Sequence, residues 1–137
     1  MSFYGYILCM NDVREYLDSD YDTLQEWWVG HGWEPVPQMF LPRGFVVEGI
    51  AAAFVYVDSV AEASMMEWVV ANPNEENKIA IYKAIKLLIE AVNDHAKARG
   101  AKFMFTSVKH DGLLKMYEKA GFMATDTGIT NMIKGVK

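Results

Sequence analysis

Apolar residues in the middle of the chain gather in three short runs, at residues 44–48, 50–58 and 63–71. The runs are rich in branched, aromatic and small side chains, and Gly49 separates the first run from the second. Short apolar runs with glycine or polar residues between them are typical of β-strands joined by turns. The pattern predicts an antiparallel meander of three strands.

After Asn72 and Pro73 the apolar positions change to a helical period that lasts until Gly100. The apolar stripe consists of Ile81, Ile85, Leu88 and Val92, and the opposite face of Lys83, Lys86, Glu90 and Lys97. This period predicts one long helix that stops at the glycine. The short apolar run at residues 101–108 then predicts a buried strand. Because a helix connects the two, we expect residues 101–108 to pair in parallel with residues 63–71.

A second helical pattern follows Asp111, a suitable N-cap, and ends at Gly121. Its apolar positions are Leu113, Tyr117 and Ala120. Residues 122–126 and 129–133 predict two final strands, with Gly128 in the turn between them.

The amino-terminal part predicts one strand and two short helices. Residues 3–9 are aromatic and branched, as in a strand, and Asp12 with Glu15 three positions later has the form of a helix capping box. A second helix follows Asp22. Its helical positions are Leu24, Trp27, Trp28 and His31, with Gly30 and Gly32 at its end. Residues 33–42 contain three prolines and predict an extended loop.

Composition favours one globular domain over residues 1–137, because 137 residues with 52% hydrophobic side chains suffice for a single core. A net charge of -5 without a basic cluster argues against nucleic acid as a partner. The single cysteine, Cys9, fits a reducing compartment, so we expect a cytoplasmic protein. The apolar run at residues 3–10 is far shorter than the ~20 residues of a membrane span.

Other chemistries find no support. Three histidines and one cysteine are scattered without ligand spacing, so the sequence predicts no metal site. The sequence also lacks a serine nucleophile elbow, a Walker loop and a dinucleotide fingerprint.

The order of predicted elements resembles that of the GNAT acetyltransferases over nearly the whole chain. Residues 116–122 read Met-Tyr-Glu-Lys-Ala-Gly-Phe, which is similar to the Leu-Tyr-x-Lys-x-Gly-Phe run of that family, with Met116 in place of leucine. The segment with Trp27, Trp28, His31 and Trp33 also resembles short acetyltransferase-like proteins of tailed phages. The resemblance implies an α/β (α+β) fold. It has a mixed, mostly antiparallel sheet of about six to seven strands, a central splayed parallel pair and about four helices.

The resemblance also implies acetyl-coenzyme A as cosubstrate and direct transfer of its acetyl group to an amine. In that family the pyrophosphate lies on N–H groups at the start of the long helix, where the helix dipole places about +0.5 charge. The positions that correspond are Asn77, Lys78, Ile79 and Ala80. Val69 and Val70 would offer backbone groups to the thioester and the pantetheine arm, where a bulge separates the two parallel strands. His110 would touch the same arm, or is simply solvated.

One part of the sequence departs from the family pattern. Residues 72–80 read Asn-Pro-Asn-Glu-Glu-Asn-Lys-Ile-Ala and contain none of the glycines that let a phosphate approach the backbone. Glu75 and Glu76 also add negative charge there. The alternative is that Asn72, Pro73 and Glu75 form an ordinary capping box.

Two residues are candidates for proton transfer. By the resemblance, Tyr117 protonates the departing thiolate, and Glu67 deprotonates the amine directly or through water. Their alternatives are a packed core tyrosine and a surface carboxylate. His31 and Trp33 are candidates for the acceptor side, or they hold the proline-rich loop in place.

Two functions therefore remain open. The first is an N-acetyltransferase with an unspecified acceptor, acting as a monomer or homodimer. The second is a catalytically silent GNAT-like phage protein that binds a protein partner.

Overall fold

The computed structural model describes residues 8–136. The chain divides into two compact units, Met1–Ser107 and Val108–Lys137, and each is described by itself. The strand predicted at residues 3–9 falls mostly outside the described residues, and Leu8 and Cys9 lie in no strand.

The first unit is built on a five-stranded sheet in the order β1-β2-β3-β4-β5. The strands are β1 (Val13–Glu15), β2 (Arg43–Val47), β3 (Ala51–Val57), β4 (Ala63–Ala71) and β5 (Phe103–Thr106). Neighbours pair antiparallel from β1 to β4, and β5 pairs in parallel with β4. The predicted meander and the predicted parallel pair are confirmed. The described residues hold five strands rather than the expected six to seven.

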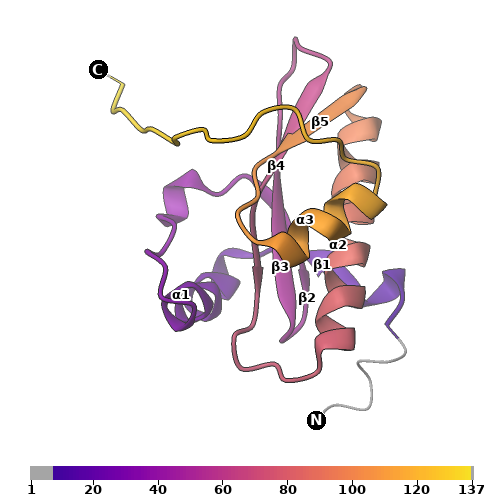
Figure 1. The fold of residues 1–137 in the computed structure, drawn as a ribbon. Helices are drawn as coiled ribbons and strands as arrows, with labels where there is room; N and C mark the ends of the chain where they lie inside the picture. The colour runs from indigo at the N-terminus through magenta and orange to yellow at the C-terminus, as the bar shows by residue number, and fades with distance from the viewer. Residues whose placement is uncertain (1–7, 137) are drawn as a thin grey trace. The chain divides into compact units, whose positions relative to one another are not determined.

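Two helices cover the two faces of this sheet, α1 (Tyr21–Gly30) on one side and α2 (Lys78–Ala98) on the other (Figure 1). With α3 (Asp111–Lys119) of the second unit, the described residues contain three α-helices, against about four expected. Single turns of 3₁₀-helix lie at Met10–Asp12, Asp18–Asp20 and Gln38–Phe40.

Each helix buries the apolar face that its sequence period predicts. On the α1 side, Leu24, Trp27 and Trp28 join Phe54 and Val70 of the sheet in one core cluster. On α2 the buried residues include Ala84, Ile85, Leu88 and Val92. Strand β3 lies between the two helices, and its Ala51–Ala53 segment is fully buried. Burial of this apolar surface, at about 25 cal/mol per Å², is the main force that holds the layers together.

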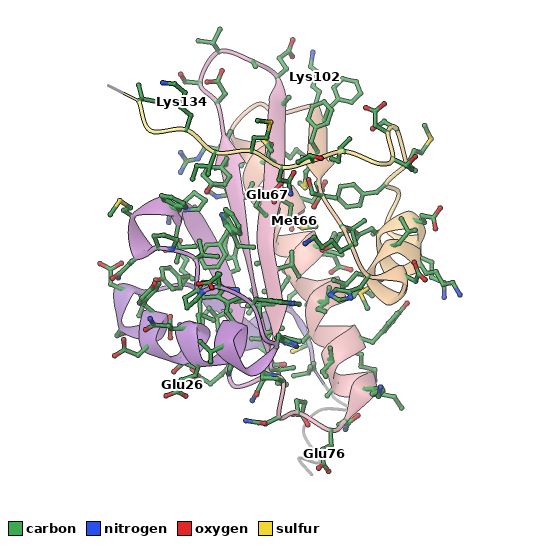
Figure 2. The ribbon with its side chains drawn as sticks, turned by 60° about the vertical axis from the view of Figure 1, so that its left-hand side comes forward. Glu26, Met66, Glu67, Glu76, Lys102 and Lys134 are labelled. Carbon is green, nitrogen blue, oxygen red and sulfur yellow. The ribbon has the colours of Figure 1, made fainter. Side chains whose placement is uncertain are left out.

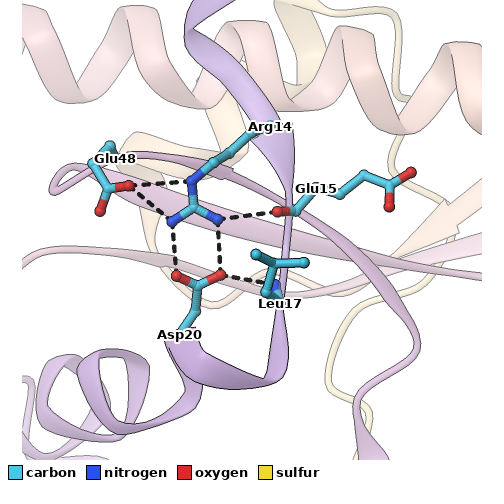
Figure 3. A network of polar contacts seen from close by, with 5 residues as sticks. All are labelled: Arg14, Glu15, Leu17, Asp20 and Glu48. Atoms are coloured by element: carbon cyan, nitrogen blue, oxygen red, sulfur yellow. Dashed lines mark hydrogen bonds and ion pairs between the residues drawn. The ribbon is translucent and has the colours of Figure 1, made fainter.

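The short helix predicted from Asp12 is wrong, because residues 13–15 form strand β1. The Asp12 carboxylate accepts the N–H of Cys9 behind it, 2.7 Å away, and therefore caps no helix ahead of it. Arg14 holds the strand to its neighbours (Figure 3). Its guanidinium donates two hydrogen bonds to Asp20, at 2.8 and 2.7 Å, and two more to Glu48, at 3.1 and 2.9 Å.

The second unit contains α3 and an irregular carboxyl-terminal segment. Gly121 follows the helix in the left-handed region, with φ of +103°, as expected of a C′ glycine. The two strands predicted at residues 122–126 and 129–133 are wrong, since residues 122–136 form neither helix nor strand. A strand needs a partner for its backbone groups, and apolar alternation in a segment does not supply one.

Candidate active site on strand β4

Strand β4 carries a bulge in its second half. Val70 pairs with Ala52 and Glu67 with Phe54, so that two residues, Trp68 and Val69, stand opposite the single residue Ala53. Trp68 has φ of +58°, in the left-handed region that is rare for a bulky side chain. The surrounding structure must therefore hold this conformation in place.

The indole of Trp68 supplies part of that support. Its Nε1 donates to the hydroxyl of Tyr56, 2.9 Å away, and that hydroxyl donates to the carbonyl oxygen of Phe40. The indole also packs against the core cluster on the α1 side. Sequence patterns did not identify Trp68, and their one signal is that apolar alternation fails at residues 68–70.

Beside the bulge, β4 loses its parallel partner. The pairing of β4 with β5 ends at Met66 and Thr106, where the Thr106 hydroxyl donates to the Met66 carbonyl oxygen at 2.8 Å. From Glu67 onward β4 pairs only with β3 among the described strands. Its backbone groups on the side of β5 therefore have no partner there among the described strands.

Glu67 is the ionisable side chain at this point. It lies next to Met66 in the middle of β4, whereas Glu76 lies beyond the end of the strand, in the turn before α2 (Figure 2). Glu67 is half-buried, and burial raises the pKa of its carboxyl group above the usual value. A carboxylate with a raised pKa is a better general base near neutral pH.

Backbone N–H groups of the turn after β4 are hydrogen-bonded to other groups of the same chain. Asn72 donates its N–H to Ile50, at 2.8 Å, and its side-chain oxygen accepts the N–H of Asn74, at 2.9 Å. The carboxylate of Glu75 accepts the N–H of Asn77, at 3.1 Å. The turn thus uses several of the N–H groups that an anion would need.

Asn77 is the N-cap of α2. Its side-chain oxygen accepts the N–H groups of Ile79 and Ala80, both at 3.1 Å. The helix therefore begins at Lys78, among the four residues expected at its start. The four residues expected at the pyrophosphate, 77–80, do lie together. Two of their N–H groups, however, already donate to the Asn77 side chain. The cap is Asn77 and not the Asn72 of the predicted capping box.

His31 and Trp33 lie at the end of α1 and next to the end of β4. The His31 Nε2 atom lies 2.7 Å from the Ala71 carbonyl oxygen, and its ring stacks on Trp33 with centroids 4.3 Å apart. Gly30 packs so tightly on Pro73 that a Cβ atom would lie 2.6 Å from its ring. These contacts fix the end of α1 against the turn that precedes α2.

Tyr117 and His110 belong to the second unit. Tyr117 is buried, and its ring lies 5.5 Å from that of Phe122, whose N–H donates to the Tyr117 carbonyl at 3.0 Å. His110 is the N-cap residue of α3, and its carbonyl accepts the N–H of Leu114 at 2.9 Å. Asp111, the predicted cap, is instead the first helical residue.

Within residues 8–136, no group of three or more His, Cys, Asp or Glu side chains is arranged to hold a metal ion. No helix there is long and apolar enough to cross a membrane.

The fold is similar to that of solved acetyltransferases. A Trypanosoma brucei acetyltransferase has 16% identity and a TM-score of 0.61, over 88% of this chain and 98% of that one. An Agrobacterium tumefaciens protein described as an acetyltransferase has 17% identity and a TM-score of 0.63, over 88% and 99%. A Novosphingobium aromaticivorans protein described as an acetyltransferase of the GNAT family has 15% identity and a TM-score of 0.64, over 84% and 53%.

At the level of sequence, no protein-family model and no curated protein matches the chain. At 15–17% identity the likeness to solved structures concerns architecture. The chain has the fold of the GNAT acetyltransferases.

Proposed function

We propose that the chain is an N-acyltransferase that moves an acetyl group from acetyl-coenzyme A to an amine. The observation that carries the proposal is the bulge at Trp68, which lies where the parallel pairing of β4 ends and directly beside the half-buried carboxyl of Glu67. Backbone groups without a strand partner and a carboxyl with a raised pKa serve the two needs of acyl transfer, polarisation of a carbonyl and removal of a proton.

The backbone at Val69 and Val70 meets the first need. An N–H group aimed at a thioester carbonyl stabilises the negative charge that develops on its oxygen during attack, and one such donor contributes roughly 3–4 kcal/mol in other enzymes. Because these donors belong to the main chain, the side chains at the two positions matter little. The bulge fixes the direction of the donors before the substrate arrives.

Glu67 meets the second need. A lysine-like amine has a pKa of about 10.4 and is mostly protonated at neutral pH, so it must lose a proton before it attacks. In the proposed reaction Glu67 takes this proton, directly or through water, and the amine nitrogen forms a bond to the carbonyl carbon. The bond to sulfur then breaks. We assign the proton for the departing sulfur to Tyr117, on the resemblance at residues 116–122.

Acetyl-coenzyme A, when bound, supplies an activated thioester. The residues of β4 fit such a group, but the start of α2 does not fit its diphosphate as it stands. Asn77 occupies the N–H groups of Ile79 and Ala80, and Glu75 and Glu76 add negative charge. Lys78 is the single cation of residues 72–80. No step of the proposed reaction depends on this turn.

The remaining roles follow the same proposal. His31 and Trp33 are proposed to border the acceptor and His110 to border the pantetheine arm. The acceptor amine belongs to a small molecule or a protein, and the protein acts in the cytoplasm, that of the host if a phage encodes it, as a monomer or homodimer.

One observation favours a second candidate function. The self-capped start of α2 is what a silent GNAT-like protein requires, since such a protein has no diphosphate to bind and needs its helix terminus satisfied. In that case the chain engages a protein partner with its surface and performs no transfer.

Calorimetric titration with acetyl-coenzyme A, followed by an acetyl-transfer assay on a panel of amines, separates the two candidates. We expect binding at or below millimolar concentration and transfer that E67Q slows by roughly 10²–10⁴-fold. Glu26, an exposed residue of α1, provides the matched control as E26Q, which should leave transfer unchanged. Absence of binding at millimolar ligand would remove the acyltransferase and leave the silent protein.

A further inference from the structure

The amino terminus of α2 is occupied by a side chain of the same chain. This helix is 21 residues long, and its dipole places about +0.5 charge at its first N–H groups. Two of these groups, on Ile79 and Ala80, point to the Asn77 oxygen. A phosphate oxygen at this terminus would have to use the same two donors.

The turn in front of the helix is held from several sides and does not move easily. Asn72 donates from its backbone to Ile50 and from its side-chain amide to Gly49, at 2.8 and 3.0 Å. Pro73 packs on Gly30 at the end of α1. The simplest opening of this terminus is therefore rotation of the Asn77 side chain alone.

A second observation sets Asn77 apart from an ordinary cap. The side chain is more than nine-tenths buried, with 7% exposure, and its Nδ2 atom has no hydrogen-bond partner among the described residues. An aspartate would cap equally well and leave no donor unpaired. Asparagine leaves the terminus uncharged at the cap position, so an entering anion meets a neutral group with an unused donor.

We propose that Asn77 is a specificity-determining residue that weakens the binding of acyl donors carrying a diphosphate. Its side-chain oxygen competes with phosphate oxygens for the N–H groups of Ile79 and Ala80. Coenzyme A then binds only as far as it displaces this cap. The inference rests on the proposed function for the identity of the donor, but not for the competition itself.

Inorganic pyrophosphate is the probe for the competition, because it carries no thioester and needs no catalysis. Affinity is measured by calorimetry, and the site by amide chemical shifts of Ile79 and Ala80. In N77G the competitor is gone, while glycine remains an acceptable N-cap. We expect about tenfold tighter pyrophosphate binding, because two donors to an anion are released, and shifts at both amides.

Two variants provide the controls. N74G makes the same replacement at an exposed asparagine of the same turn and should bind like the wild type. N77D keeps the cap and adds a negative charge, so it should bind pyrophosphate at least about threefold more weakly, and its fold is preserved even if that of N77G is not.

Unchanged or weaker binding in N77G overturns the proposal, as does binding by N77D that equals or exceeds that of the wild type. Failure of all variants to bind pyrophosphate also overturns it. Tighter pyrophosphate binding in N77G without acetyl transfer by any variant supports the competition and rejects the acyltransferase, so the two failures are distinguishable.

Discussion

Gly44 of β2 lies directly against the ring of Phe54 of β3, so close that a Cβ atom on the glycine would overlap two ring carbons. Phe54 is fully buried at the centre of the α1-side cluster and receives the edge of the Tyr16 ring, with centroids 5.0 Å apart. The ring therefore fills the space that any other residue at position 44 would need. Phe54 is also the pairing partner of Glu67, so the contact supports the strand that carries the candidate base.

We expect G44A to destabilise the protein by about 1–3 kcal/mol, because the methyl group forces Phe54 from its site in a packed core. Thermal or urea unfolding measures the effect. G112A is the matched control, since Gly112 lies inside α3 and, apart from its chain neighbours and the backbone of its own helix, no atom lies within 4 Å of its would-be Cβ. That variant should gain up to about 1 kcal/mol from helix propensity. Equal stabilities for the two variants would contradict the contact.

E67Q tests the candidate base in two ways. If Glu67 removes the amine proton, kcat falls by roughly 10²–10⁴-fold, and the loss of activity towards acid pH disappears from the pH profile. Retention of that acid limb in E67Q would assign it to another group.

The effect of E67Q on stability has the opposite sign from its effect on activity. Burial raises the folded-state pKa of Glu67, so this group contributes stability below its unfolded pKa and loses it as pH rises through the folded pKa. At pH 7 we expect E67Q to be at least as stable as the wild type, and below about pH 4 the two should match. A variant less stable at pH 7 would show that the carboxylate has a stabilising partner.

D20N tests the network around Arg14. The hydrogen bonds from Arg14, and then the N–H of Leu17, lower the pKa of the Asp20 carboxyl group. Its stabilising contribution is therefore present above the unfolded pKa and is lost as pH falls through the lower folded pKa. We expect D20N to lose about 1–2 kcal/mol at pH 7 and to approach the wild type in acid. D94N, on the exposed side of α2, should show neither effect.

Y117F tests the proposed acid. A thiolate leaves readily, because a free thiol has a pKa of about 8.5, so the loss in kcat should be no more than about tenfold. Y82F, at an exposed position of α2, is the control. A poor thiol leaving group should depend on Tyr117 more strongly, and equal dependence for all thioesters would contradict the role.

Local pattern predicted most of the first unit. The meander and the pair of strands joined by α2 follow from period and turn residues alone. The errors lie where pairing with distant residues decides the structure. Residues 13–15 pair with β2, and Arg14 bonds to Asp20, although Asp12 and Glu15 have the spacing of a capping box. Residues 122–133 have strand-like composition, but composition does not determine whether another strand is available to pair with them.

The candidate site was predictable in position and not in detail. Glu67 and Val70 were placed on the correct strand, but three asparagines in residues 72–77 offer three possible caps to α2. Which of them is used depends on where Asn72 is held by the turn between β2 and β3, and this contact lies 22 residues away along the chain, at Ile50. Spacing within the turn does not contain that information.

The extra residue in β4 shifts the alternation of side chains between the two faces of the sheet by one position. Ala52 and Phe54 point to the same face of the sheet, so their partners Val70 and Glu67 do so too, although they are three positions apart. Removing either Trp68 or Val69 would restore the regular alternation of the strand, so Glu67 and Val70 would keep their faces and their partners on β3. The residue in the left-handed region would be lost, and with it the local bend that a bulge gives a strand. The extra residue is therefore dispensable for the core packing of β4, and its consequence is confined to the backbone beside Glu67.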